Sequence, residues 1–556
     1  MTNHTLAPNH IDEIPVLDAA SADVILWADI WRRFQPVTPY GQRWKVSVQP
    51  FVPGQEEAWT RALQQLERDA DVLTEEDVRR LREQLRRVPD IEDTLSTLTA
   101  PDAVIQPKQA LLLKQCAFIG RACANDEAAQ RMGGLPLSLW TLLMDAFGED
   151  TSLTFAVEHI GGEAYQTLGR EVANAAAAYA ERVRRRDQDW MEAVGRKPNR
   201  DGVLALSLPV EATTAERLKR TDGVRWIKDT PFESVFEVLP TAAMAAAAER
   251  LEAAQRALED CAQQVMRRLT DAVRAELPHW YEAVRQLCHL DIRLAKVQML
   301  RSMSGCVPHQ GDSIHIRLVD GVHVGVADAL QQRQLDFTPL TWAVDAGVSV
   351  ICGSNMGGKT VAMTTLCACQ MLAQYAMPVP ARQFETALVR MVRFCSGGAT
   401  DAKSGLSSFG AEVVRLTHVW EELQVATPAL LCFDEPGKAT NPVEGEALTI
   451  GLMRCLKALT PQVVGVIATH FAAPLRELDV SWFRVSGLQA TALEVREAFT
   501  DATDKISRLE RAMRYTIERL EQGEVPHEAV LVAQWMGAPE RLLQETRAFL
   551  EGRTEP

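Results

Sequence analysis

Glycines, a lysine and a threonine stand together near the middle of the chain, at a spacing that suits phosphate binding. The segment Gly353-Ser-Asn-Met-Gly-Gly-Lys-Thr360 fits the pattern G-x-x-x-x-G-K-[ST]. The apolar run 348–352 precedes it and predicts a buried strand, and a helix is expected over 361–375. In the order strand, glycine-rich loop and helix, backbone N–H groups and a helix N-terminus hold phosphate oxygens. The segment therefore predicts a P-loop.

The cofactors expected at a P-loop are ATP and Mg²⁺. The Lys359 ammonium would reach the β- and γ-phosphates, and the Thr360 hydroxyl would coordinate Mg²⁺. The residues expected to contact the nucleotide are Gly353, Ser354, Asn355, Met356, Gly357, Gly358, Lys359 and Thr360.

Two further apolar runs end in polar side chains. The run 429–433 leads into Asp434 and Glu435, which predicts a buried strand that carries a Mg²⁺ ligand, Asp434, and a general base, Glu435. The run 463–468 leads to His470. A histidine at the carboxyl end of a strand in an open α/β sheet faces the ligand crevice, where it could sense the γ-phosphate or orient the attacking water. An equal alternative is that His470 only stabilises the fold and has no role at the ligand.

A third segment, Ser404-Gly-Leu-Ser-Ser-Phe-Gly-Ala-Glu412, is small and polar and opens a helical run, 411–423. Two interpretations stay open for it. It is an ordinary helix start, or it reaches a phosphate, because helix N-termini bind anions.

Taken together, these motifs resemble the MutS family, the ATPases of DNA mismatch repair. MutS proteins carry T-G-P-N-M-G-G-K-S-T, S-G-x-S-T-F, D-E-x-G-x-G-T and A-T-H, and the chain has counterparts in that order at 352–360, 404–409, 434–440 and 468–470. In the family, the serine that matches Ser407 reaches across a dimer to the other subunit's γ-phosphate. The resemblance implies a dimer of identical or paralogous subunits, with catalytic roles for Lys359, Ser407, Glu435 and His470.

The chain departs from the family pattern around these motifs. Pro436 stands where MutS has an apolar residue, Ala439 replaces a glycine, and Leu406 replaces an arginine. Asn441-Pro-Val-Glu-Gly445 replaces S-T-x-D-G. Both acidic residues are kept, so hydrolysis is expected to be intact, while communication between the two sites could differ.

Length and composition set the class of protein. The 556 residues are enough for two to four domains, and the net charge is −15. Neither a membrane-spanning run nor a signal peptide is expected, so the protein is interpreted as cytoplasmic, without a membrane partner. Non-specific DNA binding depends on Lys and Arg neutralising phosphates, so the acidic balance makes DNA a less favoured partner without excluding a local basic patch.

The eleven cysteines are scattered. Cys352, Cys432 and Cys455 lie in apolar runs, which favours reduced, buried thiols over disulfides. Cys367 and Cys369 form the one close pair, and with no second pair or histidine nearby they do not predict a zinc site.

The fold class expected is α/β plus all-α, in which a helical core with lever arms and a clamp joins an ABC-type P-loop ATPase domain. The expected divisions are an N-terminal lead over 1–37, a helical core and lever domain over 38–300 with a clamp-like insertion over about 160–240, the ATPase domain over 301–500 and a C-terminal helical dimerisation element over 501–556. The segment Thr38-Pro-Tyr-Gly-Gln-Arg43 resembles the start of the MutS core, which leaves no room upstream for the family's mismatch-reading and connector domains.

Several elements are expected within these divisions. A helix over 55–73 and a helix of about 50 Å over 241–277 belong to the core. Short strands are expected over 203–209, 235–239, 314–318 and 321–324. After His470, the amphipathic run 503–521, the segment 526–540 and a last helix to about 551 resemble the helical hairpin of the MutS C-terminus.

The cluster Arg182, Arg184, Arg185 and Arg186 is the candidate nucleic-acid contact of the clamp, although a solvated helix face is the favoured alternative. Two functions stay open for the whole protein. The first is a DNA-associated MutS-like clamp ATPase that does not read mismatches. The second is an ATP-driven protein-remodelling factor, because short, acidic MutS-like proteins resemble those encoded beside lysine 5,6-aminomutase, which are thought to reactivate that cobalamin enzyme. A MutS2-type relative is a weaker third.

Overall fold

The computed structural model describes residues 14–148, 152–199, 201–353, 358–396, 407–471, 480–486, 515–520, 530, 533 and 538–551. The chain forms two compact units. Unit 1 comprises 1–86, 131–133 and 288–556, and unit 2 comprises 87–130 and 134–287. Unit 2 is therefore inserted into the sequence of unit 1.

A six-stranded sheet forms the centre of unit 1, in the order β13-β12-β7-β11-β10-β9. Its strands are β7 (Gly347–Cys352), β9 (Met391–Ser396), β10 (Ala429–Asp434), β11 (Val463–Ala468), β12 (Ser481–Val485) and β13 (Ile517–Arg519). The strands from β12 to β9 run parallel, and β13 is antiparallel to β12. A smaller sheet contains β4 (His309–Gln310), β8 (Gln383–Thr386), β5 (His315–Gly321) and β6 (Leu340–Asp345).

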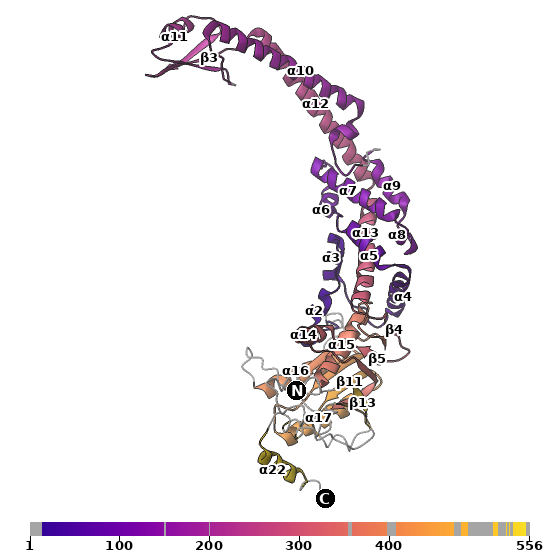
Figure 1. The fold of residues 1–556 in the computed structure, drawn as a ribbon. Coiled ribbons are helices and arrows are strands. Elements are labelled where there is room, and N and C mark those ends of the chain that lie inside the picture. Colours follow the sequence, from indigo (N-terminus) through magenta and orange to yellow (C-terminus); the bar gives the residue numbers. More distant parts are fainter. Residues whose placement is uncertain are drawn as a thin grey trace, which may run out of the picture. The chain divides into compact units, whose positions relative to one another are not determined.

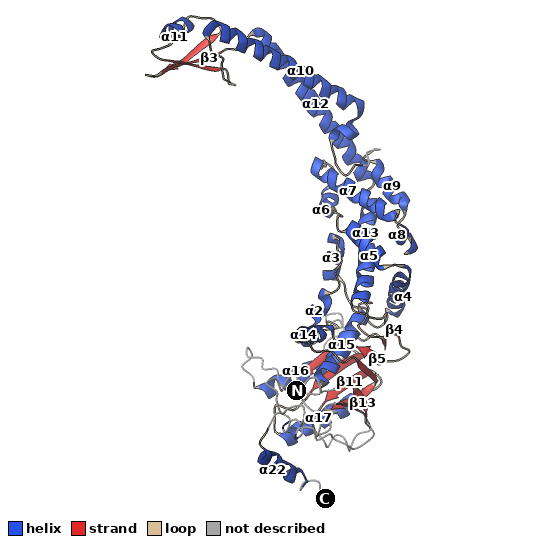
Figure 2. Cartoon of the chain, in the orientation of Figure 1, coloured by secondary structure: helices blue, strands red, loops and turns tan. Residues whose placement is uncertain are grey.

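Helices cover both faces of the six-stranded sheet (Figures 1 and 2). Along β10, Leu430 and Cys432 pack with α15 (Lys359–Gln374) in one apolar core, while Leu431 and Phe433 belong to a second core. The alternation follows from the two-residue period of a strand. The second core also contains residues of α16 (Ser408–Leu423) and α17 (Pro442–Lys457). Burial on both faces explains the nearly continuous apolar sequence of these strands.

The remaining helices of unit 1 come mostly from the first 86 residues. They are α1 (Ala19–Val24), α2 (Trp27–Arg32), α3 (Pro39–Ser47), α4 (Glu56–Val72), α5 (Glu75–Leu85), α14 (Val324–Gln332), α22 (Glu540–Glu551) and the part of α13 (Leu277–Ser302) from residue 288 onward.

A buried carboxylate explains the segment that starts α3. Asp291 on α13 accepts hydrogen bonds from the backbone N–H groups of Val37 and Thr38 and from the Thr38 hydroxyl, at 2.7–2.9 Å. The Thr38 side chain in turn caps α3. A Cβ on Gly41 would lie 2.4 Å from an Asp291 oxygen, so the close approach of this carboxylate requires glycine.

Unit 2 is a helical body that carries a small sheet. Its helices are α6 (Glu92–Thr97), α7 (Pro107–Ala124), α8 (Glu127–Arg131), α9 (Leu137–Asp145), α10 (Val157–Val194), α11 (Ala212–Leu218) and α12 (Ala242–Ala275). In Figure 1, α10 and α12 lie side by side and bear the sheet at their far ends. The sheet has the order β1-β3-β2, with β1 (Val203–Ser207), β2 (Val224–Asp229) and β3 (Glu233–Val238).

The element predictions for the site strands and the long helices are confirmed. The expected helix over 55–73 is α4, and the one over 241–277 is α12, which Thr241 caps. The mixed α/β class with a large helical part is also confirmed. Of the C-terminal predictions, the last helix is α22, while 503–514, 521 and most of 526–537 lie outside the described residues.

Three predictions are wrong. Residues 321–324 do not form a strand of their own, because β5 ends at Gly321 and the His323 side chain caps α14. Residues 517–519 form β13 rather than a helix, since pairing with β12 and the Arg484–Glu518 ion pair outweigh the helical pattern. Cys455 is exposed rather than buried, because it lines the open apolar cavity between α16 and α17.

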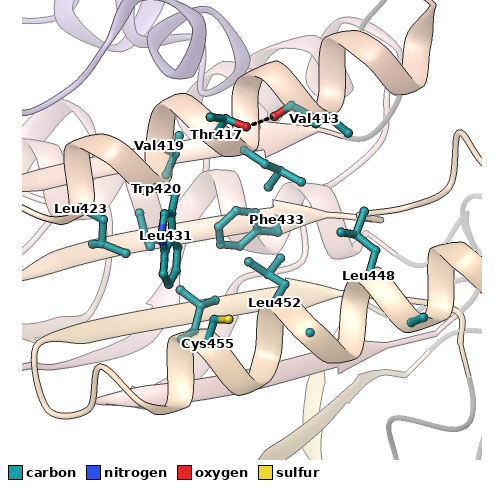
Figure 3. Close-up of a pocket in the computed structure, with 14 residues that line it drawn as sticks. Val413, Thr417, Val419, Trp420, Leu423, Leu431, Phe433, Leu448, Leu452 and Cys455 are labelled. Atoms are coloured by element: carbon teal, nitrogen blue, oxygen red, sulfur yellow. Dashed lines mark hydrogen bonds between the residues drawn. The ribbon is translucent and has the colours of Figure 1, made fainter. Parts of the chain in front are cut away.

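An apolar cavity of about 480 Å³ lies between α16 and α17 (Figure 3). Trp420 and Val413 of α16 and Leu448 and Leu452 of α17 line its walls, and Phe433 of β10 forms part of its floor. The second core of the sheet is therefore thinly covered at this place.

Among the described residues, no helix is long and apolar enough to cross a membrane. The same part of the chain holds no group of three His, Cys, Asp or Glu side chains arranged for a metal ion.

Replacement of Gly120 by alanine tests the packing of unit 2. A Cβ on Gly120 of α7 would lie 2.1 Å from the Trp140 ring of α9, so Gly120→Ala should lower the free energy of unfolding by about 1–3 kcal/mol. Gly169→Ala in α10 is the control, because nothing lies within 4 Å of its new Cβ and alanine favours a helix by about 0.5–1 kcal/mol. Calorimetry of both variants checks the difference, and equal melting temperatures would contradict the packing described.

Candidate active site

The carboxyl ends of three neighbouring parallel strands meet at one edge of the six-stranded sheet. The strands are β7, β11 and β10, which lie side by side in that order. The glycine-rich segment follows β7, Asp434 ends β10, and His470 follows β11. Ligands of open α/β sheets bind at such an edge.

The helix that follows the glycine-rich segment begins at Lys359. Its N-cap is Gly358, at φ +80°, which has no side chain with which to cap the helix. A helix start of this kind offers N–H groups to an anion. The Lys359 side chain is buried, and its ammonium donates to the Gly353 carbonyl at 2.6 Å. Ser354, Asn355, Met356 and Gly357 lie outside the described residues.

Thr360 and Asp434 form the pair expected to hold the metal ion. The Thr360 hydroxyl donates to an Asp434 carboxylate oxygen at 2.6 Å. Burial raises the pKa of Asp434, and the hydrogen bond from Thr360 offsets part of that rise. Adjacent hydroxyl and carboxylate oxygens are hard ligands, so the pair fits Mg²⁺.

Glu435 lies at the centre of a charged cluster. Its carboxylate is hydrogen-bonded to His470 and accepts from Lys438, and it lies 3.6 Å from the Lys359 ammonium. The Lys359 ammonium also lies 3.2 Å from the His470 ring. The hydrogen bond to His470 is the largest influence on Glu435 and, with Lys438 and Lys359, lowers its pKa to about 2 despite partial burial. Burial lowers the pKa of Lys359, against the pull of Glu435 and Asp434.

The backbone of Glu435 is unusual for a residue other than glycine. Its φ is +55°, in the left-handed region that costs about 1–2 kcal/mol for an L-residue. Its N–H donates to the Ala468 carbonyl at 3.0 Å, which holds the end of β10 against β11. This turn lets the side chain reach His470 on the neighbouring strand's end.

Ser407 stands at the N-terminus of α16. It is exposed, and its hydroxyl caps α16 by accepting from the Gly410 N–H at 3.1 Å. In the described part of the chain it makes no hydrogen bond to the cluster around Glu435. Residues 404–406 lie outside the described range, so of that motif only 407–412 can be placed.

A cavity of about 310 Å³ adjoins the start of α15. Lys359, Thr360 and Glu435 line it, together with the aromatic residues Phe337 and Tyr515. The aromatic residues were missed by sequence reasoning, because Tyr515 is distant in sequence and Phe337 lies in an unpatterned loop. A cavity lined by phosphate-binding groups and by aromatic rings fits a nucleoside triphosphate.

A third missed residue is Glu412 of α16. Its carboxylate accepts from the Gly437 N–H, two residues after Glu435, at 2.6 Å. Burial raises the pKa of Glu412, and the Gly437 bond opposes the rise. This contact joins the helix that Ser407 caps to the loop that follows Glu435.

The arginine cluster belongs to α10 in unit 2. Arg182, Arg184 and Arg185 are exposed, whereas Arg186 is half-buried and ion-paired with Asp187 at 2.7 Å. Three of the four cations are therefore available to a polyanion.

Comparison with known proteins identifies a domain of the chain. Residues 349–548 match the family model described as MutS domain V. The chain carries a MutS domain V. The match covers the glycine-rich segment, the end of β10, the end of β11 and β12.

Individual MutS relatives match parts of the chain. It is 29% identical over 245 residues to the DNA mismatch repair protein MutS of Lactobacillus delbrueckii subsp. bulgaricus, which is 44% of this chain and 28% of that protein. It is 28% identical over 213 residues to the Endonuclease MutS2 of Streptococcus sanguinis, 38% of this chain and 26% of that protein. It is 27% identical over 292 residues to the Endonuclease MutS2 of Solidesulfovibrio magneticus, 51% of this chain and 34% of that protein. The chain thus spans about a third or less of the length of these relatives.

Replacement of Glu435 tests the electrostatics of the cluster. Because its pKa is lowered from 4.5 to about 2, the ionised carboxylate stabilises the fold fully above about pH 4.5, and this stabilisation is lost as the pH falls towards 2. Glu435→Gln should therefore lower the free energy of unfolding by about 2 kcal/mol at pH 7, and by less at pH 3.5.

The matched control for this replacement is Glu76→Gln, which removes an exposed ion pair with Arg79 and should change stability by less than about 1 kcal/mol. Denaturant unfolding at both pH values gives the comparison. A Glu435→Gln deficit of equal size at pH 7 and pH 3.5 would mean that the charge does not cause it.

Proposed function

We propose that unit 1 binds ATP with Mg²⁺ and hydrolyses it, as the motor of a dimeric clamp ATPase of the MutS family. One observation carries the proposal. Lys359, Thr360, Asp434, Glu435 and His470 come from three strand ends and meet beside a cavity that aromatic residues also line. ABC-type architecture of the P-loop domain is part of the same proposal.

The roles of the residues follow from their contacts. The first-turn N–H groups of α15 and the Lys359 ammonium would hold phosphate oxygens, since both are donors beside the cavity. Mg²⁺ held by Thr360 and Asp434 would neutralise charge on the phosphates. The carboxylate of Glu435 is the proposed general base. It is ionised at neutral pH and can accept a hydrogen bond from the attacking water, although a pKa of about 2 in this arrangement makes it a weaker base than a free carboxylate.

His470 is proposed as the residue that orients Glu435. Its ring is hydrogen-bonded to that carboxylate and lies close to Lys359. A ring between the proton acceptor and the phosphate-binding cation is suited to sensing whether the γ-phosphate is present.

Ser407 is proposed to act in the partner subunit's site. It is exposed at the N-terminus of α16 and, in the described part of the chain, makes no hydrogen bond to the charged cluster, which suits a residue that completes a composite site. The dimer would contain two identical subunits, or this chain and a paralogous MutS-like subunit.

The clamp ligand proposed first is DNA. The three exposed arginines of α10 support it, and the relatives named above are a DNA mismatch repair protein and endonucleases. Phosphate contacts by arginine need no base sequence, which suits a clamp that does not read mismatches.

A protein client is the second candidate, because the small sheet of unit 2 is not basic at its surface. Lys219 is paired with Asp229, and Arg225 with Glu237. Phe232 is 78% exposed and Trp226 is 48% exposed beside these pairs. Exposed aromatic residues among neutralised charges favour a protein surface over a nucleic acid, as in a remodelling factor that reactivates a cobalamin-dependent aminomutase.

The ATPase rate with and without duplex, mismatched and branched DNA separates the two candidates. We expect Mg²⁺-dependent hydrolysis that Lys359→Ala abolishes, and stimulation by DNA that fades steeply with salt. Replacement of Arg182, Arg184 and Arg185 by glutamine should reduce that stimulation and its salt dependence. A triple glutamine variant at the exposed residues Arg61, Arg79 and Arg86 is the control for net charge.

A Lys359-dependent rate that is indifferent to every DNA would favour the protein client. Absence of any Lys359-dependent hydrolysis would overturn the ATPase proposal itself.

Phe337→Ala tests the aromatic lining of the cavity. Loss of a ring that stacks on a base costs about 1–3 kcal/mol, so KM for ATP should rise by about tenfold or more. The chemical groups are untouched, so kcat should change by less than about twofold. Steady-state kinetics check the split, and an unchanged KM would place the base elsewhere.

A further inference from the structure

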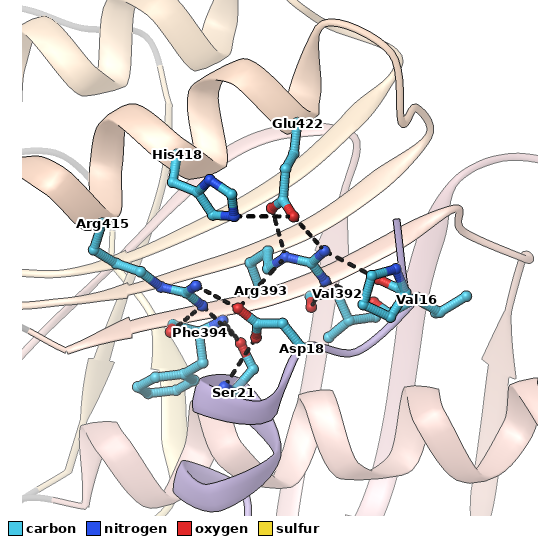
Figure 4. Close-up of polar contacts among 10 residues, drawn as sticks. Val16, Asp18, Ser21, Val392, Arg393, Phe394, Arg415, His418 and Glu422 are labelled. Atoms are coloured by element: carbon cyan, nitrogen blue, oxygen red, sulfur yellow. Dashed lines mark hydrogen bonds and ion pairs between the residues drawn. The ribbon is translucent and has the colours of Figure 1, made fainter. Parts of the chain in front are cut away.

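The N-terminal segment 14–24 lies against the outer edge of the six-stranded sheet (Figure 4). The Val392 N–H on β9 donates to the Val16 carbonyl at 2.7 Å, and Leu17 forms a parallel bridge with Val392. Helix α1 packs on β9 directly afterwards. The segment therefore covers the edge strand of the sheet, which would otherwise present unpaired backbone groups.

A fully buried arginine joins this segment to α16. Arg393 on β9 forms a two-point ion pair with Glu422 of α16, at 2.8 and 3.0 Å. Its other donors reach the carbonyls of Pro15 and Val16, both at 3.0 Å. A planar guanidinium holds several acceptors at fixed angles, so the segment, β9 and α16 are held in one arrangement.

A second connection lies closer to the start of α16. Arg415 of α16 is ion-paired with Asp18 and donates to the Ser21 hydroxyl at 3.1 Å and to the Phe394 carbonyl at 3.4 Å. The Phe394 N–H donates to the same Ser21 hydroxyl at 2.8 Å. Phe394 lies near the end of β9 and Arg415 in the first half of α16, so Asp18 and Ser21 join the two elements that flank 397–406.

Asp18 is suited to this role by its charge. It caps α1 by accepting from the Ser21 N–H at 2.9 Å, and it faces the Arg415 guanidinium with its carboxylate. Burial alone would raise the pKa of Asp18, but the hydrogen bonds from Arg415 and Ser21 outweigh it and lower the pKa. The pair is therefore charged at neutral pH.

One face of α16 carries all of these anchors. Glu412 contacts the loop after Glu435, Arg415 contacts the N-terminal segment, and Glu422 contacts the edge strand. Ser407 stands at the N-terminus of the same helix, two turns before Arg415. A shift of the helix along its anchored face therefore moves Ser407 with it.

We propose that residues 14–21 form a strap that positions α16, and that Asp18, through Arg415, sets the place from which Ser407 acts. The inference rests on the proposed function, in which Ser407 completes the partner subunit's site. Asp18 is in this view a positioning residue, since it contacts neither nucleotide nor reacting atoms. The side-chain contacts of Asp18 in the described part of the chain are with Ser21, Arg393 and Arg415.

The test is Asp18→Asn in the full chain, because asparagine keeps the N-cap of α1 and removes the charge that faces Arg415. Asp29→Asn is the matched control, since it removes an exposed ion pair with Arg32 on α2. We expect Asp18→Asn to lower kcat on the order of tenfold, because a small misplacement of a catalytic group can cost that much, and to leave KM for ATP unchanged. Asp29→Asn should change neither.

Two further measurements separate positioning from a general loss of structure. In a Ser407→Ala background, Asp18→Asn should lower kcat no further, whereas a structural defect would lower it by the same factor in both backgrounds. Hydrogen exchange of the Gly410 and Ala411 amides should speed up in Asp18→Asn, while the first turn of α17, which Asn441 caps, stays protected.

The outcomes are distinguishable. An unchanged kcat, a multiplicative effect with Ser407→Ala, or unchanged exchange at the start of α16 would each overturn the strap. If Ser407→Ala itself leaves the ATPase rate unchanged, the composite site fails, and the exchange measurement still decides whether Asp18 positions α16.

Discussion

Burial of the parallel sheet on both faces is the constraint on which the site depends. The side chains of β7 and β11 are buried along their whole length, so the polar groups of these strands can meet solvent only where the strands end. Lys359, Asp434 and Glu435 are gathered at that edge, each with a pKa moved from its ordinary value by burial or by the others. The chemistry of the cluster is thus a consequence of how the sheet is covered.

The same constraint explains why local sequence patterns identified the site strands so well. A buried parallel strand must be apolar throughout, and the polar residue that follows it marks its end, so β7, β10 and β11 could be predicted together with Lys359, Asp434, Glu435 and His470. Their convergence also followed from the rule that parallel strands present their carboxyl ends at one edge. The hydrogen bond between Glu435 and His470 and the left-handed backbone of Glu435 could not be predicted, because they depend on the register of β10 against β11.

Contacts between distant segments account for what local patterns missed. Tyr515 lines the cavity together with Phe337, although 178 positions separate them in the chain. Residues 14–24 were predicted only as part of an N-terminal lead, yet they complete the edge of the sheet. The strand β13 carries a pattern that also suits a helix, and its partner β12 decides the outcome. Tertiary context overrides local preference in each case.

The discontinuous sequence of unit 1 has a consequence for the order in which the protein folds during synthesis. Asp18 and Arg415 are 397 positions apart, and unit 2 lies between them in the chain. As the ribosome moves from the N-terminus, unit 2 is complete before residue 300, whereas the first 86 residues must wait for β9 and α16. Until then the apolar side chains of α1, α2 and α4 lack the sheet that buries them. The nascent chain therefore carries an unsatisfied apolar surface through most of its translation, which is the condition that chaperones recognise.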